Sequence, residues 1–138
     1  MRSEWLDNRL RFNVTGFYYD YKDLQVYTVV NNGNVPQQIL DNAPGARVFG
    51  AEFELLARPA PNFTVGAGLS LLNSRFNRNF IGGNGVNLRG NRLAYSPPVT
   101  LTGNAEWAIP MGSNELVLQS DFSLAARSFT ETTNNPRL

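Results

Sequence analysis

The sequence predicts an all-β fold: an antiparallel up-and-down meander of about five long strands, part of a transmembrane β-barrel and open as a fragment. Three observations support this prediction. Apolar and polar residues alternate with a period of two over long stretches, no segment has a convincing helical period, and short turns alternate with long polar loops. Successive side chains of a strand point to opposite faces, so the alternation gives each face of the sheet its own polarity.

The alternation is clearest at 99–109, where the odd positions are apolar or small and the even positions are polar apart from Ala108. The stretches 49–57 and 63–71 also have apolar odd positions, whereas 116–126 has apolar even positions, broken at Ser120. The first stretch, 10–28, alternates at its start and then places aromatics on both parities. We therefore predict strands at 9–28, 46–58, 63–76, 97–109 and 115–129.

The lengths of these strands and of their links favour a membrane barrel. Each alternating stretch reaches the roughly 9–11 residues that a tilted strand needs to cross a bilayer, beyond the about 5–6 residues usual in soluble sheets. The links at 58–62 and 110–114 are short, whereas those at 29–45 and 77–96 are long and rich in Asn and Gly. Outer-membrane barrels have short periplasmic turns and long outer loops.

Aromatic residues lie near the ends of the predicted strands, as interfacial girdles require. On the short-turn side they are Trp5, Phe63 and Trp107, and towards the loops they are Tyr27, Phe76, Tyr95 and Phe129.

The composition excludes several classes of function. The chain has 138 residues, a formal net charge of +1, no Cys and no His. Disulfides, thiolate chemistry, hydrolytic triads and the usual zinc sites therefore cannot be built from it, and we expect neither an enzyme nor a metal site. The near-neutral charge gives no reason to expect a nucleic-acid partner. No apolar run reaches the roughly 20 residues of a membrane helix.

Three motifs occur in the order and spacing found in one family. FYYDYKDLQV at 17–26, GAEFEL at 50–55 followed by Ala57-Arg58-Pro59, and GNRL at 90–93 followed by SPP at 96–98 resemble strand and turn segments of TonB-dependent outer-membrane receptors. The resemblance covers nearly the whole chain. Each motif alone is weakly specific, but the three in order form a strong signal.

This resemblance implies the C-terminal part of a barrel domain of about 22 strands. Such receptors carry an N-terminal plug, contact TonB, and import ferric siderophores or similar scarce nutrients across the outer membrane of Gram-negative bacteria. The resemblance also implies that the transported ligand is a ferric siderophore and that the protein holds no bound cofactor. We expect residues 1–138 to be a partial barrel domain, cut at both ends, with the plug and remaining strands absent. The opening 1–5 has no apolar signal-peptide core, and 135–138 is not the aromatic-ended strand that closes such barrels.

Two alternatives remain open at this point. A soluble all-β ligand-binding module would also alternate and would recognise its ligand through loops. Another outer-membrane barrel of the porin type would fit the alternation equally well.

Two sets of charged residues are candidates for function. The first lies in or beside the loop 77–96 and would suit an anionic ligand, because the guanidinium fork matches carboxylates: Arg75, Arg78, Arg89 and Arg92. The second is expected to face the lumen or the plug: Glu52, Glu54, Glu106, Asp121 and Arg127. Ordinary lumen polarity and solvated loop charge are the simpler interpretation of both sets.

The alternation also makes geometric predictions. One face should carry Phe49, Phe53, Leu55, Val65, Leu69, Leu101, Trp107, Leu118 and Phe122, and the other Glu52, Glu54, Thr64, Ser70, Thr102, Glu106 and Asp121. The strands at 9–28 and 115–129 should be unpaired on their outer sides. In the two tight hairpins we predict four facing pairs: Glu54 with Gly66, Glu52 with Gly68, Trp107 with Leu118, and Asn104 with Asp121.

Overall fold

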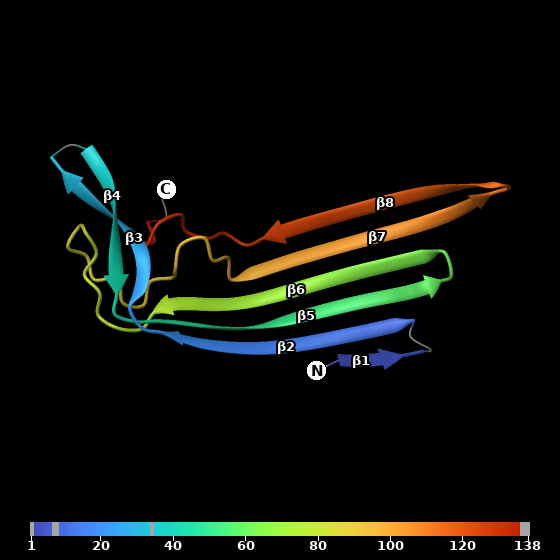
Figure 1. The fold of residues 1–138 in the computed structure, drawn as a ribbon, viewed down its shortest axis with the longest axis horizontal. Coiled ribbons are helices and arrows are strands. Elements are labelled where there is room, and N and C mark those ends of the chain that lie inside the picture. Colours follow the sequence, from blue (N-terminus) through green and yellow to red (C-terminus); the bar gives the residue numbers. More distant parts are fainter. Residues whose placement is uncertain (1, 7–8, 34, 136–138) are drawn as a thin grey trace. The chain divides into compact units, whose positions relative to one another are not determined.

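The computed structural model of the protein describes residues 2–6, 9–33 and 35–135. All regular structure in these residues is β, which confirms the predicted fold class (Figure 1). The strands are β1 (Arg2–Trp5), β2 (Leu10–Tyr21), β3 (Leu24–Asn32), β4 (Val35–Ala43), β5 (Ala46–Ala60), β6 (Phe63–Phe76), β7 (Val99–Met111) and β8 (Asn114–Ala125).

Six of these strands form one sheet in the order β1-β2-β5-β6-β7-β8, and β3 and β4 form a separate two-stranded sheet. The pairings of β1 with β2, β6 with β7 and β7 with β8 are antiparallel. Figure 1 shows these neighbours side by side, with short turns joining β5 to β6 and β7 to β8. Among the described residues β1 and β8 do not pair, so the sheet is open.

Four predicted strands are confirmed to within a few residues at each end, as β5, β6, β7 and β8. The predicted strand 9–28 is wrong, because β2 ends at Tyr21 and the chain turns before β3 starts at Leu24. Asp23 has a φ of 53°, in the left-handed region. Aspartate is one of the few residues other than glycine that adopt this region readily, so Asp23 can form the break without a glycine.

The predicted long loop 29–45 is also wrong, because most of it belongs to the hairpin of β3 and β4. Each residue of Leu24–Asn32 faces one of Val35–Ala43, for example Thr28 and Ile39. The turn contains Gly33 with a φ of 69°. Its sequence signal is the Gly33-Asn34 pair between two strand-forming segments, since Gly-Asn is one of the pairs typical of a two-residue hairpin connection.

The expectation for the sheet edges was half correct. Strand β8 is the last in the sheet order, as predicted. Strand β2, however, is covered on its outer side by β1, with Ser3 facing Phe12 and Trp5 facing Leu10. Four residues are too few to show a periodic pattern, so β1 could not be predicted from the sequence.

The register of the second tight hairpin is confirmed. Trp107 faces Leu118 and Asn104 faces Asp121. Strands β7 and β8 are joined by Gly112-Ser113, and Gly112 has the positive φ, 67°, that a type II′ turn requires at its first central position. The facing pairs predicted for the β5–β6 hairpin stay a prediction.

The chain divides into two compact units. We call Met1–Gly16, Ala51–Leu71 and Val99–Ala126 the sheet unit, and Phe17–Gly50, Leu72–Pro98 and Arg127–Leu138 the loop unit. The long strands β2, β5 and β6 contribute to both. Each unit is described by itself below.

The two faces of the sheet unit separate by polarity. The Phe12 and Phe53 rings stack with centroids 6.5 Å apart, while the next residues meet on the other face, where Asn13 Nδ2 donates to Glu54 Oε2 over 3.1 Å. The neighbouring strands keep the same parity, since Leu69 faces Leu101 whereas Ser70 faces Thr100. The predicted assignment of these side chains to two faces is therefore confirmed in the sheet unit.

The loop unit has a small hydrophobic core of its own. Its buried members are Ala43, Ala46, Phe76, Phe80 and Leu88. The loop after β6 folds back on this core, since Leu88 N donates to Phe80 O over 2.7 Å and Gly90 N donates to Phe76 O over 2.9 Å. Phe76 is only 1% exposed, so the expectation that it belongs to an interfacial girdle is wrong.

We expect Leu88→Ala to loosen this loop selectively. Removing a fully buried leucine side chain costs about 2–5 kcal/mol through lost burial and the cavity left behind. Hydrogen exchange at the Leu88 and Gly90 amides should report the loss as faster local opening. The matched control is Ile81→Ala in the same loop, because Ile81 is largely exposed and its truncation should change exchange little. Equal effects of the two substitutions would contradict this assignment of the core.

Candidate functional site

The apolar face of the sheet unit is uncovered. No hydrophobic side chain in the described part of this unit is buried, and Trp107, Phe122 and Leu124 are 48%, 52% and 61% exposed. The aligned residues on β7 and β8 keep this face continuous, with Leu101 facing Leu124 and Gly103 facing Phe122. A side chain added at Gly103 would collide with the Phe122 ring, whose nearest carbon would be 2.3 Å from the new Cβ. A contiguous apolar face of this kind indicates contact with lipid or with another protein.

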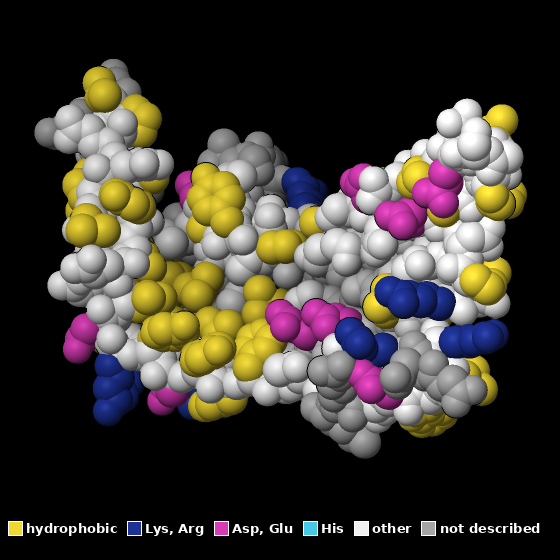
Figure 2. All heavy atoms as spheres, turned by 45° about the vertical axis from the view of Figure 1, so that its right-hand side comes forward, with side chains coloured by type: hydrophobic (Ala, Val, Ile, Leu, Met, Phe, Trp, Pro, Cys, Tyr) yellow, Lys and Arg dark blue, Asp and Glu magenta, His cyan; other side chains and the backbone are white. Residues whose placement is uncertain are grey.

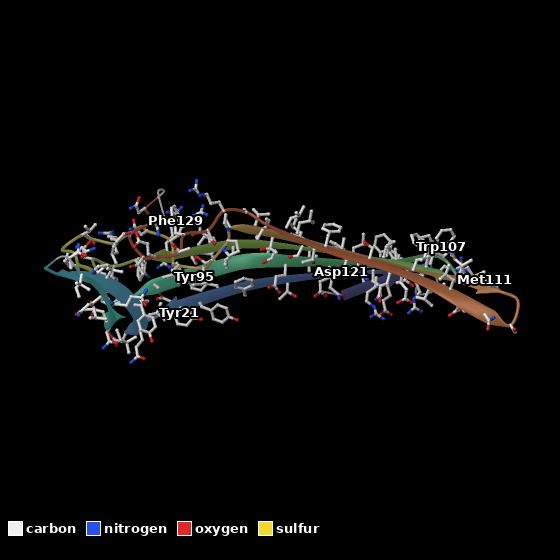
Figure 3. The ribbon with its side chains drawn as sticks, turned by 90° about the horizontal axis from the view of Figure 1, so that it is seen from above. Tyr21, Tyr95, Trp107, Met111, Asp121 and Phe129 are labelled. Carbon is white, nitrogen blue, oxygen red and sulfur yellow. The ribbon has the colours of Figure 1, made fainter. Side chains whose placement is uncertain are left out.

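Aromatic rings mark the short-turn end of this face. Phe63 and Trp107 face each other across β6 and β7, and their rings meet edge to face with centroids 6.4 Å apart. Trp5 is 65% exposed at the turn end of β1. Figure 3 labels Trp107 and nearby Met111 at this end. Aromatic side chains in such positions are typical of the membrane–water interface.

The loop unit carries aromatic residues of a different kind. Tyr18 stacks on Phe49 with centroids 6.5 Å apart, and the Arg47 guanidinium lies 5.8 Å from the centre of the Tyr18 ring. Phe17, Tyr19 and Tyr21 form a row along β2, with neighbouring centroids 5.8 and 6.0 Å apart. These contacts explain why the alternation of β2 mixes beyond Phe17, because aromatic residues occupy both of its faces there.

The opposite face of the sheet unit is polar and brings four of the predicted acids onto one surface: Glu52, Glu54, Glu106 and Asp121. Glu106 faces Thr64 on one side and Gln119 on the other. Asp121 faces Asn104, and alternation places it on the opposite side from Trp107 (Figure 3). Figure 2 shows acidic side chains amid polar surface on the face it presents. All four acids are exposed, and their neighbours are hydroxyl, amide and glycine groups.

Glycines on this polar face make room for polar side chains of the neighbouring strand. A Cβ at Gly66 would lie 2.3 Å from Asn104 Oδ1, and one at Gly68 would lie 2.6 Å from Thr102 Oγ1. The neighbouring strand therefore fills the space above each glycine with a polar side chain. The arrangement suits a wet surface that forms hydrogen bonds, and it includes no nucleophile paired with a base. Arg127, predicted to join this set, lies beyond the end of β8 and belongs to the loop unit.

The four loop arginines have separate environments. Arg75 and Arg92 face each other in an isolated bridge, which brings these two close together. Arg75 Nη1 donates to Gly90 O over 2.7 Å, so this guanidinium braces the loop. Arg78 and Arg89 are exposed, and neither guanidinium forms an ion pair within the described part of the chain. These two arginines are therefore the better placed to meet a ligand.

The structure also shows a pocket of about 450 Å³ in the loop unit that sequence reasoning missed. It lies among β3, β4 and two loop segments, and its lining is Leu24, Val26, Tyr27, Val29, Gln38, Leu93, Ala94, Tyr95, Thr130, Glu131 and Thr132. The residues come from four separate parts of the chain. The missed β3–β4 hairpin supplies five of them, so no local motif could have indicated the pocket.

No helix long and apolar enough to cross a membrane occurs in the described residues. Within the same residues, no group of three or more carboxylate, imidazole or thiol side chains is arranged to hold a metal ion.

Comparison with known proteins agrees with the fold and the two-faced sheet. The chain matches the family described as TonB dependent receptor-like, beta-barrel over residues 1–137. No solved structure matches the chain. The family match spans nearly the full sequence, and the open antiparallel sheet has the polarity that a barrel wall requires. The chain therefore belongs to the β-barrel family of TonB-dependent receptors.

Proposed function

We propose that the protein forms part of the barrel wall of an outer-membrane TonB-dependent receptor that takes up a ferric siderophore or a similarly scarce nutrient. One observation carries the membrane assignment: a sheet unit with an uncovered apolar face and a polar opposite face. Lipid would then cover the apolar face, and the water-filled lumen of the barrel would hydrate the polar face. The family is one of receptors and transporters, and binding and passage require no covalent chemistry, in keeping with a non-enzymatic role.

The polar face suggests the partners of this barrel wall. In this proposal residues 1–138 form a partial barrel domain, and the full-length receptor supplies a plug domain that TonB engages. Glu52, Glu54, Glu106 and Asp121 would then face the lumen or the plug, offering acceptors to its donors.

The loop arginines support an anionic substrate in this proposal. Arg78 and Arg89 present exposed guanidinium groups, and Arg75 with Arg92 adds positive charge where the loop leaves β6. A ferric siderophore with carboxylate or catecholate donors carries the complementary charge. The iron belongs to the transported ligand and is not a resident cofactor.

The soluble-module alternative fits the structure less well. The loop unit has a core, but the described sheet unit buries no hydrophobic side chain, which a soluble domain of this size would need.

We expect the protein that carries this sequence to fractionate with the outer membrane. Cells that depend on it for iron should grow on a ferric siderophore only when TonB is present, because full-length receptors of this family work together with TonB. Membrane fractionation and growth under iron limitation measure the two parts. Recovery in the soluble fraction would contradict the membrane assignment, and growth without TonB would contradict the transport assignment.

A pair of adjacent substitutions tests which face meets lipid. Phe122→Arg places a charge on the apolar face and should lower the free energy of unfolding in a bilayer by about 2–4 kcal/mol if it lies near the midplane. Ser123→Arg, one residue on, faces Thr102 on the polar side and should have little effect. Phe122→Leu keeps the face apolar and separates loss of the ring from gain of charge. A larger effect at Ser123 would reverse the assignment of the two faces.

A third test concerns the loop arginines. Arg78→Ala and Arg89→Ala should each weaken binding of an anionic ferric siderophore by about fivefold, the loss of one exposed charge contact. Lys22→Ala is the control, since Lys22 is an exposed cation of the loop unit outside the arginine set. Binding is measured by quenching of intrinsic fluorescence in the purified receptor. Unchanged affinity in both arginine variants would indicate that these residues are solvated loop charge.

A further inference from the structure

We propose that the pocket of the loop unit is a binding site for an organic cation with an apolar or aromatic body. The proposal rests on the residues that line the pocket, which include apolar side chains and two tyrosines. Glu131 is the sole charged residue among the described lining residues. Its volume, about 450 Å³, lies in the range of small-molecule sites. As part of a transport route the site rests on the proposed function, but its ligand chemistry can be tested without transport.

One wall of the pocket is held in place by hydrogen bonds between two loop segments. Tyr95 N donates to Phe129 O over 2.8 Å, and Asn91 Nδ2 donates to Thr132 O over 3.0 Å. Asn134 bonds to both main-chain polar groups of Arg92, accepting from its N–H over 2.6 Å and donating to its carbonyl over 2.9 Å. The segment that carries Glu131 is therefore fixed against the segment that carries Tyr95.

The opposite wall is the β3–β4 hairpin. Val29 and Gln38 face each other across the two strands and both line the pocket. Leu24 and Val26 line it as well and pack against the core of the loop unit, which anchors the base of the hairpin. A site supported by a core on one side and a bonded loop on the other is preformed, and this reduces the ordering cost of binding.

The chemistry of the lining favours a positive charge. One carboxylate oxygen of Glu131 accepts from Thr133 Oγ1, and the side chain has no cationic partner among the described residues. Tyr27 and Tyr95 are 66% and 76% exposed, so their ring faces are accessible, and such faces attract cations. No arginine lines the pocket in the described structure, so it differs in charge from the arginine set of the same unit.

Tyr95 supplies an independent observation. Its φ is 54°, in the left-handed region that bulky side chains rarely adopt. The exposed ring gains little burial from this conformation. The conformation belongs to the turn at residues 94–95, and this turn presents the Tyr95 ring at the pocket.

The test uses three probes with one carbon skeleton, titrated into the purified full-length receptor and followed by saturation-transfer NMR. They are 4-phenylbutylamine, which is a cation at pH 7, neutral 4-phenylbutanol and anionic 4-phenylbutyrate. We expect the amine to bind about fivefold or more tightly than the alcohol, and the carboxylate to bind most weakly. Equal affinity for the amine and the alcohol, or no saturable binding of the amine, would overturn the proposal.

Variants assign the binding to the pocket. Glu131→Gln should reduce the preference for the amine over the alcohol by about fivefold, while Glu115→Gln, a matched exposed carboxylate on β8, should leave it unchanged. Tyr95→Ala should weaken both probes, whereas Tyr95→Phe keeps the ring face and should bind both normally. An unchanged preference for the amine over the alcohol in Glu131→Gln would refute the site. Normal binding by Tyr95→Phe would show that the loop tolerates a substitution at this position.

The outcome separates this proposal from the proposed function. A receptor that supports TonB-dependent growth but does not prefer the amine retains its transport function and loses only this site. A chain that prefers the amine through Glu131 but remains in the soluble fraction retains the site and loses the membrane assignment.

Discussion

The described strands of the sheet unit form a single layer, and this constraint decides most of their sequence. Its described strands bury no hydrophobic side chain, so whatever surrounds the sheet meets every residue directly. The backbone can satisfy its hydrogen bonds only through neighbouring strands, which explains the continuous ladder from Leu71–Val99 to Phe63–Trp107. Because the backbone pairing is fixed, the sequence can suit the environments of the two faces only through the alternation of polar and apolar side chains.

The loop unit follows a different rule, because it has a core that the sheet unit lacks. Phe76, Phe80 and Leu88 bury their side chains against the start of β5 and the end of β4, and the loop main chain bonds back to β6. Loops anchored in this way can hold side chains such as Arg89 and Tyr95 in defined positions. In the proposed receptor the sheet unit would contribute the barrel wall, and the braced loop unit would present side chains to a ligand.

Period-two alternation predicted the parts of the fold that depend on it. Strand β6 and the register that pairs Trp107 with Leu118 followed from parity and turn position alone. The fold departs from this pattern where other effects decide the structure: the left-handed Asp23 that ends β2, the four-residue β1, and the burial of Phe76 by its own loop. For the candidate site, parity grouped Glu52 with Glu54, but the pocket around Glu131 depends on contacts between distant segments, which a single sequence does not reveal.

The β3–β4 hairpin pairs only with itself and has no place in the order of the six-stranded sheet. Extra residues added in pairs at its Gly33 tip would lengthen both strands together and leave every partner in the larger sheet unchanged. A single residue inserted within β7, between paired positions, would instead force a bulge or a one-residue shift that turns apolar side chains towards the polar face. The β3–β4 hairpin can therefore change its length without disturbing the larger sheet, whereas an odd insertion inside a strand of that sheet would mix its two faces.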